Sequence, residues 1–435
     1  MNISKTIIIF LALLISLAGI AQTPVTTYYD KNNTIVNEKY FILNNDSSMV
    51  DGQYVKYHEN GEEAVKGQFK EGLKTGEFQE FSPEGNLVRK LIFENNLRHG
   101  PVIVYDAKGR VLQQGQYEND SLTNQVVVFF EDGKVKNETN FKKGKPDGLV
   151  KEYYPNSNIK QEMYYANGKP NGITKTYYEN GNLKTEAMFT NGTLNGEFKT
   201  YYENGQLETV STNIRGTKNG SFKNYDEQGN LILEGQYVNG KPDGENKGYF
   251  PNGNPAHYYY YSGGFRVGEN TSYYENGKPK QKIRYEKEEK DREITSYYEN
   301  GQMSQKSFYK NDQPANTWSY YDKNGGITVE EPYKNGKISG MRKTFDGKGN
   351  MILEEPYQNG VIIGVSKAYY PSGKLKSETI YRLGKRHGIY KQYYETGEIE
   401  WEGHYAGGRK AGVWKRFDVE GNEIETEDLR NFSAP

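Results

Sequence analysis

The sequence of 435 residues contains no cysteine, only three tryptophans and only five histidines. Without cysteine the chain can form no disulfide bond and offers no thiolate ligand to a metal ion. An excess of charge of one sign is also missing, because 56 Lys and Arg residues stand against 57 Asp and Glu residues, which gives a net charge of −1. A chain without a basic excess has no global field with which to hold a nucleic acid. We therefore expect no disulfide framework and no nucleic-acid partner.

Hydrophobic residues are sparse too, at 34% of the chain. The sequence nevertheless contains 39 Tyr, 18 Phe and 49 Gly. Disordered chains are poor in aromatic residues, so this composition is not typical of them. Tyrosine is amphipathic and is favoured in half-buried strands. The composition thus predicts thin sheet structure in which tyrosine supplies most of the buried surface.

Long hydrophobic runs are absent beyond the first 21 residues. A lysine precedes the apolar run Ile7–Leu17, and Gly19 and Ala21 fit positions −3 and −1 of a signal-peptidase site. The run has 11 residues, too few for a helix to cross a hydrocarbon core of ~30 Å. We predict a signal peptide over 1–21, cleavage near Ala21/Gln22, and export to the periplasm or the exterior. The mature chain is expected to contain no transmembrane span.

A glycine recurs every 24 residues from Gly61 to Gly421, with Ser157 as the exception among sixteen positions. An aromatic residue stands four positions before each of them, from Tyr57 to Phe417. So strict a period indicates that each unit packs on the previous one in the same way. The irregular stretch 286–293 (EKEEKDRE) replaces both glycines of one turn.

Within one unit, Asn180-Gly181 is typical of a two-residue type I′ turn between strands Gly172–Glu179 and Asn182–Thr190. A second glycine-rich turn, from Thr190, leads to the next unit. The sequence therefore predicts an all-β fold: an elongated antiparallel β-hairpin array of about sixteen units in a single extended sheet. We expect a capping segment at 22–51, the repeat array at 52–424 and a polar tail at 425–435.

The predicted turn fixes the pairing of the two strands. It places Lys175 opposite Glu186, and Gly172 opposite Phe189, whose ring can cover a cross-strand glycine. Near the turn it pairs Glu179 with Asn182 and Tyr178 with Leu183. The Lys–Glu pairing recurs as Lys151/Glu162, Lys223/Glu234, Lys343/Glu354, Lys367/Glu378 and Lys391/Glu402, and becomes Thr/Lys at Thr271/Lys282 and Thr295/Lys306.

Alternation along the strands then sorts the side chains onto two faces. Tyr178, Leu183 and Phe189 are expected on the drier face. The opposite face is expected to carry a ladder of Lys175, Tyr177 and Glu186.

Two units, YVNGKPDGENKGYFPNG (Tyr237–Gly253) and YRLGKRHGIYKQYYETG (Tyr381–Gly397), resemble MORN repeats, and His99-Gly100 and His387-Gly388 match the occasional His-Gly of that motif. The YYENG spelling resembles the bacterial variant class, whose proteins are often labelled antitoxins. The resemblance covers about residues 52–423. It implies β-hairpin arrays that bind proteins or sit near membranes and that are not catalytic in the repeats themselves.

Few residues indicate chemistry. The five histidines lack metal-ligand spacing, the repeated glutamates are equivalent acids each next to a lysine, and no phosphate-binding lysine follows the turn glycines. We therefore predict no catalytic residue, no cofactor and no metal site. Stacked tyrosines are the one candidate ligand platform, although filling the sheet core is the alternative explanation. The platform residues are Tyr258, Tyr259, Tyr260, Tyr177 and Tyr201.

Three functions remain open. The first is an exported, non-enzymatic scaffold that binds another protein through its sheet surface, of which antitoxin-like neutralisation of a toxin is a special case; a signal peptide argues against that case in the cytosol. The second is binding of a glycan or cell-envelope polymer to the tyrosine ladder. The third is an enzyme, which a cleft with non-equivalent acids around 286–294 would indicate.

Overall fold

The computed structural model describes residues 22–286 and 289–429. The signal peptide expected at 1–21, Glu288 of the irregular turn and residues 430–435 of the expected tail lie outside this range. The described secondary structure consists of 38 strands and no helix, as the sequence predicted. The chain divides into two compact units: unit 1 runs to Asn195 and includes Glu203–Gly205, and unit 2 comprises the remainder from Gly196 onward.

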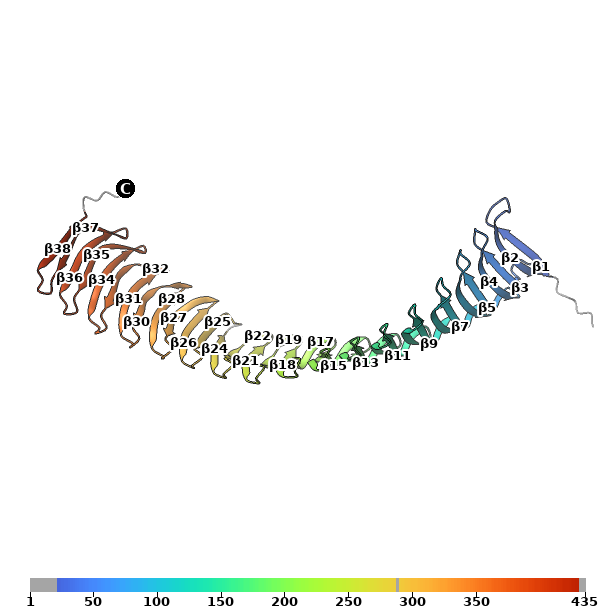
Figure 1. The fold of residues 1–435 in the computed structure, drawn as a ribbon, viewed down its shortest axis with the longest axis horizontal. Coiled ribbons are helices and arrows are strands. Elements are labelled where there is room, and N and C mark those ends of the chain that lie inside the picture. The colour runs from blue at the N-terminus through green and yellow to red at the C-terminus, as the bar shows by residue number, and fades with distance from the viewer. Residues whose placement is uncertain (1–21, 287–288, 430–435) are drawn as a thin grey trace, which may run out of the picture. The chain divides into compact units, whose positions relative to one another are not determined.

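Within each unit the strands lie side by side in chain order (Figure 1), and each pairs antiparallel with its neighbour. The strands of unit 1 are β1 Gln22–Tyr28, β2 Val36–Leu43, β3 Gly52–Tyr57, β4 Glu63–Lys70, β5 Leu73–Phe81, β6 Leu87–Glu94, β7 Leu97–Tyr105, β8 Val111–Glu118, β9 Ser121–Phe129, β10 Val135–Lys142, β11 Lys145–Tyr153, β12 Ile159–Ala166, β13 Lys169–Tyr177 and β14 Leu183–Thr190.

Strand β15 belongs mostly to unit 2, whose strands are β15 Thr193–Tyr201, β16 Leu207–Ile214, β17 Thr217–Tyr225, β18 Leu231–Val238, β19 Lys241–Pro242, β20 Gly244–Tyr249, β21 Pro255–Ser262, β22 Phe265–Arg266, β23 Gly268–Tyr273, β24 Pro279–Glu286, β25 Asp291–Tyr297, β26 Met303–Lys310, β27 Gln313–Tyr321, β28 Ile327–Lys334, β29 Lys337–Ile338, β30 Gly340–Phe345, β31 Met351–Gln358, β32 Val361–Ile362, β33 Gly364–Tyr369, β34 Leu375–Arg382, β35 Lys385–Tyr393, β36 Ile399–Ala406, β37 Arg409–Phe417 and β38 Glu423–Asp428.

The first loop of each hairpin, which carries the repeating glycine, is a three-residue loop and not the predicted two-residue turn. Gly181 N donates to Tyr178 O at 2.9 Å, and Tyr178 N donates to Asn182 O at 2.8 Å. Gly181 has φ +93°, whereas Asn180 is not among the residues with positive φ. This is a type I turn followed by a left-handed glycine. The predicted type I′ turn and the predicted pair Glu179–Asn182 are therefore wrong.

The type I′ geometry lies instead in the second loop, which joins one hairpin to the next. Lys143 and Gly144 have φ +51° and +74°, and the flanking Lys142 and Lys145 pair across this two-residue loop. Positive φ at both central residues defines a type I′ turn. The prediction thus placed this turn on the wrong one of the two loops.

A β-bulge next to the first loop offsets its extra residue. Tyr177 pairs with Leu183, and Lys184 is skipped before the next pair. The predicted pair of Tyr178 with Leu183 is wrong because it lies on the loop side of this bulge. The same shift recurs in the neighbouring hairpins.

Beyond the bulge the register is the predicted one. Lys175 lies opposite Glu186, and Gly172 lies opposite Phe189. The predicted pairs elsewhere in the chain are present as well: Lys151/Glu162, Lys223/Glu234, Thr271/Lys282, Thr295/Lys306, Lys343/Glu354, Lys367/Glu378 and Lys391/Glu402.

Alternate strands of the sheet are bent near their second loop. Between β12 and β13, Tyr165 pairs with Pro170 whereas Met163 pairs with Thr174, so β13 has two extra residues at the bend. Gly172, with φ +122°, lies at this point. A bulge of this kind sharply bends and twists the strand. Glycine allows the bend because it lacks a Cβ.

We call the face that bears Thr174, Ala187 and Phe189 the inner face, and the face that bears Ile173 and Lys175 the outer face. Thr174 and Ala187 are buried, whereas Ile173 is exposed. The face of Phe189 is therefore the drier one, as expected.

Leu183 is misplaced in the prediction. It pairs with Tyr177 and so belongs to the outer face, not to the face of Phe189. The bulge causes this exchange, because one skipped residue inverts the alternation of side chains. Tyr178 lies beyond the end of β13, in the first loop.

Aromatic rings packed against glycine make the core of the inner face. Phe78 and Trp414 are each 2% exposed, and their rings fill the space that a Cβ at Gly67 and at Gly403 would need. Trp414 Nε1 also donates to His404 O at 3.2 Å, which satisfies a backbone group freed by the bend. A single-layer sheet thereby obtains a core from cross-strand contacts alone.

The last strand, β38, continues to Asp428 and pairs with β37. Residues 425–428 thus belong to the sheet and not to the tail expected at 425–435. The exposed strand Glu423–Asp428 is strongly acidic, and such charge discourages a further strand from pairing with an edge. In unit 1, the outermost strand β1 contains Pro24, which cannot donate to a ladder.

Candidate binding surfaces

The outer face carries a repeated cluster of a lysine, a glutamate and a tyrosine. Glu162 Oε1 on β12 lies 3.5 Å from Lys151 Nζ of the same hairpin. Glu162 Oε2 accepts a hydrogen bond of 2.8 Å from Tyr177 Oη of the next hairpin. Each such glutamate links two successive hairpins. The cluster recurs with Lys223, Glu234 and Tyr249, at 3.3 and 2.8 Å, and Lys175 Nζ lies 3.6 Å from Glu186 Oε2.

The protonation states of this cluster are well separated. Burial and the hydrogen bond to Glu162 raise the pKa of Tyr177 to about 12. The hydrogen bond from Tyr249, with help from Lys223, lowers the pKa of Glu234. At neutral pH the tyrosine is therefore protonated and the glutamate ionised. General acid–base catalysis needs a group that titrates near the working pH, so the arrangement favours a structural ladder.

The predicted platform at Tyr258, Tyr259 and Tyr260 is split between the two faces. The pairing of β20 with β21 puts Tyr258 and Tyr260 on the outer face and Tyr259 on the inner face. Tyr260 Oη donates to Glu245 Oε1 at 2.9 Å, and the ring of Tyr259 stacks on His257 at 4.2 Å. These three residues therefore do not form one stacking surface.

The other two platform residues, Tyr177 of unit 1 and Tyr201 of unit 2, also lie on outer faces. They pair with Leu183 and Leu207 and are partly buried. The hydroxyl of Tyr177 is engaged by the glutamate described above, so only part of its ring is accessible to a ligand.

A second tyrosine column, in the first loops, went unrecognised in the sequence. Tyr202 Oη donates to Tyr225 O of the next hairpin at 2.8 Å, and Asn156 Nδ2 donates to Glu179 O at 3.0 Å. Where aspartate takes the position of the loop tyrosine, as Asp226 does one repeat after Tyr202, its carboxylate accepts hydrogen bonds from its own loop instead. The repeated spelling YYEN was the available signal: the second tyrosine and the asparagine join neighbouring first loops.

Beyond the ladder, the outer face exposes apolar side chains. In unit 1, Tyr164 is 50%, Ile173 41% and Met188 39% exposed, and Ile173 pairs with Met188. Aromatic residues and methionine are enriched in protein interfaces. Unit 2 exposes Met341, Val365 and Ile389 at the repeat position of Ile173.

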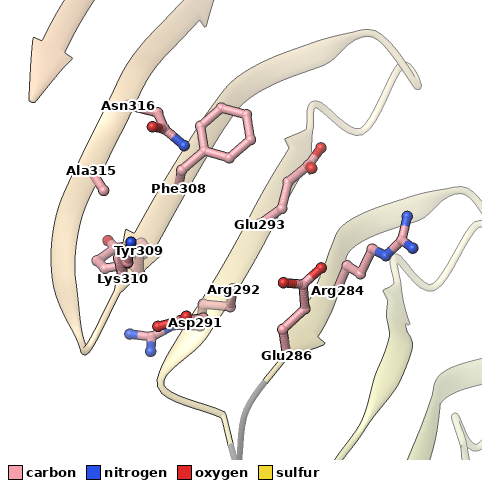
Figure 2. A pocket seen from close by; sticks show the side chains of 10 residues that line it. All are labelled: Arg284, Glu286, Asp291, Arg292, Glu293, Phe308, Tyr309, Lys310, Ala315 and Asn316. Atoms are coloured by element: carbon pink, nitrogen blue, oxygen red, sulfur yellow. The ribbon is translucent and has the colours of Figure 1, made fainter.

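The irregular strand pair β24–β25 of unit 2, which flanks a second loop, borders a pocket of about 540 Å³ (Figure 2). Arg292 stands where Gly172 stands in its own unit, and β24 pairs with β25 without a register shift. The following strand β27 keeps its bend, with Asn316 at φ +56°. The straight strand pair β24–β25 next to the bent pair β26–β27 leaves the gap. Its lining consists of Arg284, Glu286, Asp291, Arg292, Glu293, Phe308, Tyr309, Lys310, Ala315 and Asn316.

Three of these lining residues are carboxylates, which is the gathering of acids that would indicate an enzyme. Glu293 Oε1 lies 2.8 Å from Lys306 Nζ, and Asp291 Oδ1 accepts a hydrogen bond of 2.8 Å from Asn311 N. Two of the acids thus have structural partners, and the described lining includes no Ser, Thr or His to act as nucleophile or base. Over residues 22–286 and 289–429, no three His, Asp or Glu side chains gather closely enough to hold a metal ion. The lining of the pocket is polar and contains both positive and negative side chains.

Hairpins that repeat every 24 residues, stacked by glutamates and loop tyrosines, define the class of β-hairpin repeat arrays. The sequence model of the MORN repeat variant family matches residues 74–95, 122–143, 146–169, 170–191, 194–212, 218–239, 266–287, 293–311, 316–335, 363–382 and 386–406. These segments make up more than half of the chain. The chain belongs to the MORN repeat variant family, and this match confirms the resemblance seen in the sequence. The MORN repeat is a non-enzymatic type of repeat.

Solved structures with similarity to the chain share little sequence with it. A crystal structure of TcdB2-TccC3 without its hypervariable C-terminal region is 13% identical, with a TM-score of 0.15, over 96% of this chain and 25% of that one. A Photorhabdus luminescens Tc holotoxin pore is 11% identical, with a TM-score of 0.14, over 93% of this chain and 24% of that one. The chain thus spans about a quarter of the length of these proteins. The comparison with curated proteins gave no match. In the part of the chain that the structure describes, no helix has the length and apolarity that crossing a membrane requires.

Proposed function

We propose that the protein is an exported, non-enzymatic MORN-repeat scaffold that binds another protein through the outer face of its sheet. The observation that carries the proposal is the row of exposed apolar side chains on that face. Ile173 and Met188 are exposed in unit 1 although the inner face of the same hairpin has its own core at Thr174 and Ala187. Apolar residues that the core does not use are typical of an interaction surface.

The repeat architecture supports the same proposal. Equivalent hairpins placed side by side form a broad, shallow surface of the kind that repeat proteins use to bind partners. The ladder acids are ion-paired and hydrogen-bonded, which suits a rigid support better than a reaction centre. The apolar run Ile7–Leu17 and the cleavage site before Gln22 support export to the periplasm or the exterior.

Photo-crosslinking tests the binding face. A photo-reactive residue in place of Met188 or Val365 on the outer face should give discrete adducts in the native cells, whereas one in place of Glu59, in an exposed first loop, should not. Adducts of equal yield from all three positions, or from Glu59 alone, would contradict binding through the outer face.

Export has its own measurement. The N-terminal sequence of the protein recovered from the periplasm or the medium should begin at Gln22. Recovery of the protein from the cytosol with Met1 retained would overturn this part of the proposal.

A further inference from the structure

The second loops of the last four complete hairpins of unit 2 carry a concentration of positive charge. They occupy residues 333–340, 357–364, 381–388 and 405–412 and contain no aspartate or glutamate. All but 357–364 contain two or three Lys and Arg residues, seven in total, whereas the other second loops without an acid, 165–172, 189–196, 213–220 and 261–268, contain four in total. We call these four loops the basic loop row; they lie between β28 and β37 (Figure 1). Its cations are Lys334, Lys337, Arg382, Lys385, Arg386, Arg409 and Lys410.

Most of these cations have no anionic partner among the described residues. Lys410 Nζ lies 3.2 Å from Glu427 Oε2, and Arg386 contacts the hydroxyls of Tyr381 and Tyr405. Lys337, Lys385 and Arg409 are exposed, and no ion pair within residues 22–286 and 289–429 involves them. The ladder lysines Lys151, Lys175 and Lys223 are ion-paired with glutamates. The exposed cations of the basic loop row thus remain available to a ligand.

The acids are missing from a definite position. In several other second loops, an aspartate or asparagine accepts a hydrogen bond from the backbone of the next loop, as Asp147 Oδ2 does from Asn167 N at 3.0 Å and Asp243 Oδ1 from Gly263 N at 2.9 Å. In the basic loop row this position is taken by Ser339, Ile363, His387 and Ala411. These four loops thus lack the acceptor that joins several second loops elsewhere, and with it the negative charge that Asp147, Asp243 and Asp291 supply at this position.

Exposed apolar side chains accompany the cations. Leu383 is 77% exposed and lies at a loop tip with φ +49°. A bulky side chain in this left-handed region is strained by about 1–2 kcal/mol, and such strain commonly marks a functional position. Val361 and Ile363 of the neighbouring loop are also exposed.

We propose that the basic loop row binds an extended, acidic segment of a partner protein. Successive loops of one kind are two strands apart, or ~10 Å. The cations of the first, third and fourth loops are therefore spread along a line and suit a chain of negative charges rather than a single anionic group. Exposed Leu383 and Val361 lie between the cations and would find no apolar contact on a purely polar polymer. A polypeptide that mixes acidic and apolar residues uses both. This inference rests on the proposed function, because both require a protein partner.

The test uses the purified full chain and a fluorescent peptide of alternating Glu and Leu. About twelve residues suffice to span the ~30 Å from the first to the last loop of the row at ~3.3 Å per residue. The triple variant Lys337→Gln/Lys385→Gln/Arg409→Gln should bind the peptide about tenfold more weakly in fluorescence anisotropy, since each exposed ion pair contributes about a twofold effect. The matched control, Lys145→Gln/Lys169→Gln/Lys241→Gln, changes the same repeat position in other hairpins and should bind within about twofold of the wild type.

Two further arms distinguish the class of ligand. Leu383→Asn should weaken peptide binding severalfold while relieving the strained φ, so the loss cannot come from unfolding. Inorganic polyphosphate of matched charge should bind more weakly than the peptide and should be indifferent to Leu383→Asn. Tighter binding of polyphosphate would overturn the proposal in favour of an anionic polymer, and capture by anionic vesicles without peptide binding would overturn it in favour of a lipid surface.

Equal losses in both triple variants would also overturn the proposal. If the peptide does not bind while photo-crosslinked adducts still form at Met188, the role of the basic loop row is wrong and the proposed function still holds. If neither peptide binding nor adducts at Met188 are observed, the proposal of a protein partner is itself wrong.

Discussion

Ser157 offers the sharpest test of the first-loop geometry. It is the one non-glycine residue in the repeating glycine position, and its φ is +72°, close to the +93° of Gly181 in the next hairpin. Its backbone N donates to Tyr154 O at 2.9 Å, a bond that glycine keeps. Left-handed φ destabilises the folded state by about 1–2 kcal/mol for a non-glycine residue. A glycine removes this strain, but its greater freedom in the unfolded chain lowers the stability by about 0.4–1 kcal/mol. Ser157→Gly should therefore stabilise this hairpin by about 0.5–1 kcal/mol.

Gly181→Ser is the matched reverse change. The atom nearest to an added Cβ at Gly181 is Asn158 Nδ2 at 3.7 Å, an ordinary contact, so only the φ penalty remains. This variant should lose what Ser157→Gly gains, and the double variant should be close to the wild type. Gly181→Val should cost more than about 1 kcal/mol, because a β-branched side chain resists positive φ most strongly.

Hydrogen exchange followed by mass spectrometry reads out these changes locally. A gain of about 0.5–1 kcal/mol slows exchange through local opening about two- to fivefold. The effect should stay within the altered hairpin and its neighbours, because each repeat contacts only the next. Unchanged exchange in Ser157→Gly together with unchanged exchange in Gly181→Ser would refute the assigned turn, and a uniform change over all repeats would refute nearest-neighbour coupling.

Three further predictions follow from single contacts. Tyr298→Phe removes the bond of 2.8 Å to Tyr321 O and should lower the free energy of unfolding, measured with urea, by about 1 kcal/mol. Gly67→Ala places a Cβ in the space of the Phe78 ring and should cost about 1–3 kcal/mol by overpacking in the same assay; an unchanged midpoint would contradict the ring-on-glycine core. Tyr177 has a pKa raised to about 12 from 10.0, so it contributes stability that is complete below pH 10 and is lost as the pH rises toward 12. Ultraviolet titration should show that it ionises at higher pH than the exposed tyrosines. Ionisation at the same pH as the exposed tyrosines would contradict its burial.

The central register could be predicted although the turn was not. The sequence pattern Asn-Gly is compatible with two loop types, and a loop that is one residue longer than predicted is offset by the bulge at Lys184. A signal for the correct turn was available: Pro155 occupies the second position of the turn that begins at Tyr154. Proline is favoured there in type I turns and cannot adopt the positive φ of a type I′ turn.

The bends were hidden by a second explanation for the same glycines. Gly172 was interpreted as a glycine covered by Phe189, and this pairing is present. Its φ of +122° and the shift between β12 and β13 show that it also bends the strand. A glycine is expected both opposite an aromatic ring and at a bend, so its presence alone does not reveal the bend. The pocket beside β25 arises where the bend is missing at Arg292. The replaced glycines of 286–293 marked this place in the sequence, but the bend whose absence leaves the gap was not recognised.

The two kinds of loop differ in how much of their side chains the fold requires. First loops are joined by side-chain bonds, such as Tyr202 Oη to Tyr225 O, so their tyrosines and asparagines are fixed by stacking. Second loops are joined mainly by backbone, as Gly168 N to Pro146 O at 2.8 Å, a contact that many side chains can accompany. Side chains such as Asp147 join some second loops as well. Second loops that lack such an acceptor are still joined by backbone, as Gly384 N to Ile362 O at 3.1 Å, so the fold does not require it. Because of this freedom, a repeat array can add a specific binding surface at one set of loops while the bonds between its first loops keep its hairpins in register.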